Sequence, residues 1–189
     1  NLTAGGGWTQ NKKSLYLKLG QQWVIFDQFY DIDGAIISDR SRSFGSTSIY
    51  AEYGISDRLT GIVYFPFYSK STLFEQRNTA NGSVIREGES FSSLGDTNIS
   101  IKYGLLTNSK VVLSASLVLG LPLGELNKGS DGSLQTGDGE FNQMIKFDAS
   151  TSVNVAGSYP YISVYTGFNN RTNGFSDELR YGAEIGVGL

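Results

Sequence analysis

The chain has 189 residues, a formal net charge of −3 and neither cysteine nor histidine. These absences exclude disulfides, thiolate chemistry, Ser-His-Asp triads and histidine metal sites, so we expect no enzyme activity and no catalytic, cofactor-binding or metal-binding residue. Because the basic residues form no block, we also expect no nucleic-acid partner.

Glycine and aromatic residues dominate the composition. There are 24 glycines, and aromatic residues make up 13% of the chain. Both kinds of residue suit strands and tight turns better than helices. No apolar run approaches the roughly 18 residues of a membrane-spanning helix. The composition therefore indicates an all-β protein.

Alternating apolar and polar residues predict eight strands. Residues 1–13 are expected to be a flexible periplasmic lead-in, and residues 14–189 a β-barrel. The predicted strands cover residues 14–26, 44–55, 59–68, 97–106, 111–123, 140–153, 159–169 and 179–189. The fourth strand shows the pattern well, with Ile99 and Ile101 on one parity and Ser100 and Lys102 on the other.

The predicted connections alternate in length. Polar stretches at residues 31–42, 69–94 and 125–139 read as long loops, whereas residues 56–58, 107–110 and 156–158 read as short turns. Bacterial outer-membrane barrels have short periplasmic turns and longer outside loops. We therefore predict an antiparallel up-and-down transmembrane β-barrel of at least eight strands in the bacterial cell outer membrane.

Charged residues avoid the apolar parity of the fourth, fifth, sixth and eighth strands. A charge facing lipid near the bilayer centre costs about 2–4 kcal/mol, so this avoidance fits a membrane strand. The charged residues of the other parity are our candidates for lining the lumen: Lys18, Glu52, Lys102, Lys146, Asp148, Arg180 and Glu184. In a narrow barrel they would pair and fill the interior; in a wider one they would line water and tune selectivity.

A soluble β-sandwich or lipocalin-like barrel is the alternative fold. It would also have an apolar inner face, and its charged parity would then face water. Aromatic residues at the predicted strand ends, such as Trp23, Tyr53 and Phe141, favour the membrane barrel because they match interfacial girdles.

Two short motifs suggest ligand sites but are incomplete. Asp31-x-Asp33-Gly34, and Asp131-Gly132 together with Asp138-Gly139-Glu140, resemble parts of calcium loops, yet neither completes the pattern. Both motifs are better explained as turn-forming loops than as calcium sites. Asn170-Arg171-Thr172 matches a glycosylation triplet, which has meaning only in a eukaryotic secretory route.

Several stretches together resemble one bacterial family. They are residues 48–67 (SIYAEYGISDRLTGIVYFPF), 95–106 (GDTNISIKYGLL), 117–124 (LVLGLPLG), 134–143 (LQTGDGEFNQ) and 167–182 (GFNNRTNGFSDELRYG). The family comprises outer-membrane barrels labelled transporter-like or meta-pathway phenol-degradation proteins. The sequences of these stretches most resemble members from the Bacteroidetes. Its members continue past the segment that resembles residues 183–189. We therefore expect a truncated barrel, the alternative being eight strands that close by themselves.

The resemblance and the pattern together predict a porin- or transporter-like barrel. It would give passive passage to small molecules, and the resemblance implies apolar or aromatic ones. The alternative is a non-conducting structural or accessory subunit of a larger outer-membrane protein complex. The expected partners are outer-membrane lipid and, for the alternative, other proteins of such a complex; the oligomeric state stays open.

Overall fold

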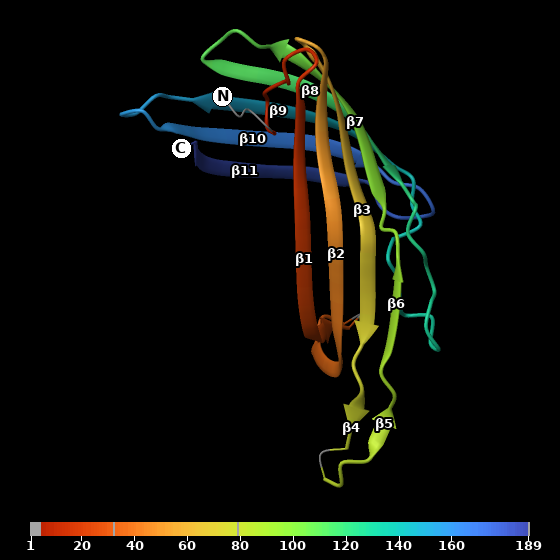
Figure 1. Cartoon of the computed structure of the whole chain (residues 1–189). Helices are drawn as coiled ribbons and strands as arrows, with labels where there is room; N and C mark the ends of the chain where they lie inside the picture. The colour runs from red at the N-terminus through yellow and green to blue at the C-terminus, as the bar shows by residue number, and fades with distance from the viewer. Residues whose placement is uncertain (1–4, 32, 79, 189) are drawn as a thin grey trace.

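The computed structural model describes residues 5–31, 33–78 and 80–188, and these residues form β-strands and connecting segments (Figure 1). One antiparallel sheet contains most of the chain. Its strands follow in the order β1 (Leu15–Tyr30), β2 (Ile36–Ser56), β3 (Leu59–Leu73), β7 (Thr97–Leu106), β8 (Val111–Leu121), β9 (Asn142–Ser152), β10 (Tyr159–Asn170) and β11 (Glu178–Gly188). The eight predicted strands are therefore confirmed. The described residues include no helix long and apolar enough to cross a membrane.

Three further strands lie where the sequence predicted only a loop. The short strands β4 (Gln76–Arg77) and β5 (Val84–Arg86) form a separate hairpin, and β6 (Glu89–Ser93) pairs with the far half of β3. The predicted loop at residues 31–42 is also too long, because β2 begins at Ile36. In both regions the few apolar residues do not recur at every second position, so the sequence shows no strand pattern although the backbone continues to pair.

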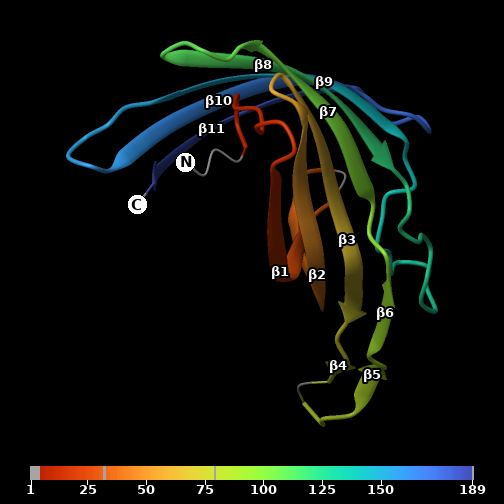
Figure 2. The ribbon, with the colours of Figure 1, turned by 45° about the horizontal axis from the view of Figure 1, so that its top comes forward.

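The sheet curls into a half-barrel (Figures 1 and 2). The strands β1 to β3 cross the direction of β9 to β11, as strands on facing walls of a barrel do when each tilts against the axis. Among the described residues, β1 and β11 each pair on one side only, so the sheet stays open between them. Closure by eight strands, which we had left as an alternative, does not occur in this structure.

The two faces of the sheet have opposite character. On β7 the apolar Ile99 and Ile101 are exposed, whereas Ser100 and Lys102 on the other parity are buried. The same arrangement recurs along the sheet, and the buried apolar side chains among the described residues are only Leu73, Val112 and Leu134. Soluble proteins bury apolar side chains and expose charged ones. This sheet does the reverse, with a polar concave face and an apolar convex face.

A glycine of the second strand makes room for a large ring. Trp23 of β1 lies opposite Gly45 of β2, and a Cβ at position 45 would lie 2.6 Å from the Trp23 ring. The indole therefore lies against the Gly45 backbone on the apolar parity, where Trp23 is 57% exposed.

Candidate functional site

The predicted lumen residues all lie on the parity of the concave face, but they differ in burial. Glu52, Lys102 and Asp148 are buried, and Lys146 is half-buried. The exposed ones are found on the edge strands: Lys18 on β1, and Arg180 and Glu184 on β11. The structure thus brings the central members together and leaves the outer three at the open sides.

Two of the buried charges bind the N-terminal segment, residues 5–10, which runs along the concave face. The Glu52 carboxylate accepts hydrogen bonds from the Gly5 backbone N–H at 3.1 Å and from the Gln10 side chain at 2.8 Å. The Lys102 ammonium donates to the carbonyl oxygens of Gly6 at 2.9 Å and Trp8 at 3.3 Å. These residues, which we expected to be a lead-in, are held by side chains of β2 and β7.

Glycine lets this segment approach the sheet closely. The Gly7 N–H donates to the Ser150 hydroxyl at 2.8 Å, and a Cβ at position 7 would lie 2.9 Å from the Val112 carbonyl oxygen. Trp8 then packs edge-on against Tyr161 of β10, with ring centroids 5.9 Å apart. The segment therefore contacts strands from β2 to β10 and covers the concave face near the short turns.

Four of the remaining predicted lumen residues have partners on the sheet itself. Lys146 forms an ion pair with Asp148 at 2.8 Å and lies 4.7 Å from the centre of the Tyr165 ring. Arg180 pairs with Glu178 at 2.5 Å. Glu184 accepts a hydrogen bond from the Tyr161 hydroxyl.

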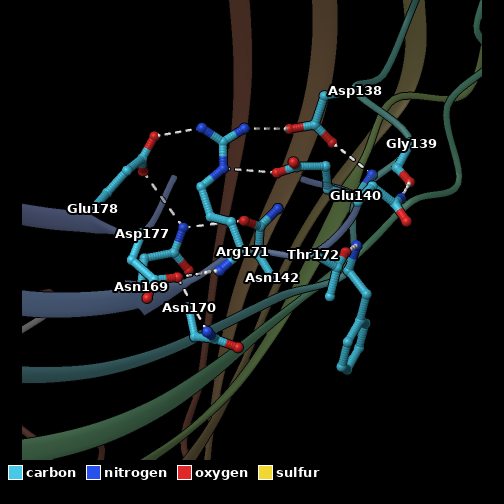
Figure 3. Close-up of polar contacts among 12 residues, drawn as sticks. Asp138, Gly139, Glu140, Asn142, Asn169, Asn170, Arg171, Thr172, Asp177 and Glu178 are labelled. Carbon is cyan, nitrogen blue, oxygen red and sulfur yellow. Dashed lines mark hydrogen bonds and ion pairs between the residues drawn. The ribbon is translucent and has the colours of Figure 1, made fainter. Parts of the chain in front are cut away.

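At the other end of the sheet, one arginine binds three carboxylates (Figure 3). Arg171, in the connection after β10, lies 2.7 Å from Glu140, 2.7 Å from Glu178 and 3.7 Å from Asp138. The hydrogen bond to Glu140 raises the pKa of Arg171 above its usual range. Asn169 adds a hydrogen bond to Glu178 at 3.4 Å. We name this set, Asp138, Glu140, Asn169, Arg171 and Glu178, the Arg171 cluster.

Sequence reasoning missed the Arg171 cluster as a unit. Its parts were visible, because 138–140 resembled a fragment of a calcium loop and 170–172 a glycosylation triplet. Their convergence depends on β9 and β10 pairing in register, which brings the two connections together at one end of the strands. A local motif carries no information on that pairing.

A single aspartate anchors the long connection between β8 and β9. The Asp96 carboxylate accepts the Gly124 N–H at 2.9 Å and the Asp138 N–H at 2.7 Å. Burial raises the pKa of Asp96, and the nearby Asp138 carboxylate adds to that effect, although the two backbone donors oppose it. The connection at residues 125–139 is irregular, as predicted, apart from a bridge between Lys128 and Leu134.

This connection also reaches the concave face. Its Leu134 is buried, and so is Leu73 at the end of β3. A cleft of about 360 Å³ is lined both by the sheet, with Arg42 and Leu73, and by this connection, with Thr136. The concave face is thus narrowed near the short turns by the N-terminal segment and near the long connections by residues 125–139.

The calcium-like motif forms a turn. The Asp31 carboxylate accepts the backbone N–H groups of Asp33 at 3.0 Å and Ala35 at 2.8 Å, as expected of an aspartate that stabilises its own loop. Over the described part of the chain, no three acidic side chains form a group that could hold a metal ion.

Comparison with protein-family models, with curated proteins and with solved structures finds no match to this chain.

Proposed function

We propose that this chain forms part of the wall of a bacterial outer-membrane β-barrel that gives small molecules passive passage. The observation that carries the proposal is the inverted distribution of residues, with apolar side chains exposed on the convex face and polar ones buried on the concave face. A strand between lipid and an aqueous lumen requires this distribution, because only the outward side chains meet hydrocarbon.

The polarity of the concave face argues against the soluble alternative. A lipocalin-like barrel surrounds its ligand with apolar inward side chains. Here the inward side chains include Ser100, Lys102, Ser114 and Ser116. In water, such a sheet would expose its apolar residues on the convex face and would bury hydroxyls and charges instead.

The polarity of the concave face determines which class of molecule would pass. Hydroxyl and charged side chains along the concave face favour water-soluble solutes over the apolar or aromatic compounds that the family resemblance implies. We therefore propose small hydrophilic molecules as the transported class.

One observation favours a second candidate, the non-conducting subunit of a larger outer-membrane complex. The N-terminal segment lies across the concave face and is bound by Glu52, Lys102 and Ser150. A lumen filled in this way would serve as structure and carry no current.

Current through planar bilayers separates the two candidates. Ser116 and Leu117 are neighbours on β8, but Ser116 is buried on the concave face and Leu117 is exposed on the convex face. For a conduit, Ser116→Trp lowers the single-channel current, whereas Leu117→Trp leaves it unchanged. Equal effects of the two substitutions would contradict passage along the concave face. Absence of current, together with co-purification with a larger barrel, would establish the second candidate instead.

A further inference from the structure

Three cations lie in one row across the concave face. The pairing register places Lys102 of β7 beside Ser116 of β8, and Ser116 beside Lys146 of β9. Lys146 in turn lies beside Gly167 of β10, which is paired with Arg180 of β11. Neighbouring strands are about 4.8 Å apart, so successive cations of the row have backbones roughly 10 Å apart, within reach of their long side chains.

Small residues between the cations leave space for a ligand. Ser116 separates the two lysines, and Gly167 separates Lys146 from Arg180. A cleft of about 380 Å³ lies over this part of the face, and Lys102, Ser116, Lys146 and Arg180 all line it. That volume is within the usual range for small-molecule sites.

Positive groups line the cleft, and acidic groups do not. No carboxylate is among the described residues that line it. The two nearest acids of the lumen set, Glu52 and Asp148, are only 0% and 3% exposed, and their carboxylates are bound to the N-terminal segment and to Lys146 respectively. Arg180 is likewise paired with a carboxylate, that of Glu178 at 2.5 Å. The charged groups that line the cleft are therefore all cationic, and the carboxylates that pair with Lys146 and Arg180 lie outside its lining.

Hydrogen-bond donors remain for a ligand in this cleft. The Ser116 hydroxyl is buried and has no hydrogen-bond partner among the described residues. The Lys102 ammonium gives two of its three donors to the carbonyl oxygens of Gly6 and Trp8. A ligand that accepts hydrogen bonds and carries negative charge matches these groups.

We propose that this row, Lys102, Ser116, Lys146 and Arg180, binds a small oxyanion, a carboxylate or a phosphate. Rows of lysine and arginine are the usual means by which a pore selects anions. Charged hydrogen bonds to a planar carboxylate or a phosphate are stronger than those between neutral groups. The proposal rests on the proposed function in one respect, since the concave face must be an aqueous lumen for a solute to reach the row.

Calorimetric titration of the full chain in detergent tests the site. The ligands are succinate, inorganic phosphate and, as the cationic control, choline. We expect succinate or phosphate to bind and choline to give no heat. Whichever anion binds more tightly shows whether the site prefers a carboxylate or a phosphate. The double substitution Lys146→Met with Arg180→Met should weaken anion binding about tenfold or more. Lys18→Met is the matched control, because Lys18 lies on the same face outside the cleft, and it should change affinity less than about twofold.

Circular dichroism of each variant checks that the sheet is retained. Choline binding equal to that of the anions, anion binding unaffected by the double substitution, or no anion binding at all would overturn the proposal. These outcomes differ from failure of the proposed function. Anion binding without current would refute the conduit and leave the site, whereas current without anion binding would refute the site and leave the conduit.

Discussion

A positive charge placed on the convex face measures whether that face meets lipid. Leu117 is the seventh residue of the 11-residue strand β8 and is 50% exposed, with Ile101 and Ile145 paired on either side. A membrane strand spans the hydrocarbon with about 9–11 residues, so Leu117 would lie only about 2–3 Å from the midplane of a tilted strand. Leu117→Arg should then cost close to the full 2–4 kcal/mol measured for midplane charges in barrels.

In water the same substitution would have little effect. An exposed position away from caps and networks changes the free energy of unfolding by no more than about 0.5 kcal/mol. Reversible urea unfolding from lipid vesicles gives the difference directly, and Asn108→Arg in the turn between β7 and β8 is the control. If Leu117→Arg and Asn108→Arg agree within about 0.5 kcal/mol, the convex face does not meet hydrocarbon and the membrane proposal fails.

Two further predictions concern the ends of the concave face. Ser150→Cys introduces the only thiol of the chain. This thiol should react slowly with a water-soluble reagent, and faster once residues 1–10 are deleted, because Gly7 covers position 150. Equal reaction rates would mean that the N-terminal segment does not lie there. Arg171→Met should lower the free energy of unfolding by more than the loss of an exposed ion pair, because it leaves the buried Glu140 carboxylate without its cation. Lys128→Met removes an exposed ion pair and should cost less than about 1 kcal/mol by the same denaturation; a similar loss for both would refute a special role for Arg171.

Alternation was enough to predict the strands of the sheet but not where they end. Leu113, Leu117 and Leu119 on β8 mark one apolar face, so this strand could be predicted from residue types alone. From Ser38 to Arg42 in β2 both parities are polar, and β6 has Phe91 as its one apolar residue, so neither stretch shows a regular alternation. Only the backbone ladder defines a strand there, and the ladder depends on a partner that is remote in the sequence.

The site was predictable by parity and not by register. Lys102 and Lys146 could be assigned to the inward face because each alternates with apolar neighbours. Whether they share one row depends on the pairing register of β7, β8 and β9. Turn lengths and bulges determine that register. The run from Gly5 to Gly7 was read as flexible because glycine is permissive, yet the lack of side chains is what lets it lie against Ser150.

The two tryptophans of the chain lie on opposite faces of the sheet and act as separate fluorophores. Trp8 packs against Tyr161 on the concave face, whereas Trp23 is exposed on the convex face. Replacing either one by phenylalanine leaves a single emitter, which reports on one face alone. The emission of Trp23 reports when the convex face enters its final environment, and the emission of Trp8 reports when the N-terminal segment binds the concave face. The order of these two steps can therefore be timed in one protein without an added dye.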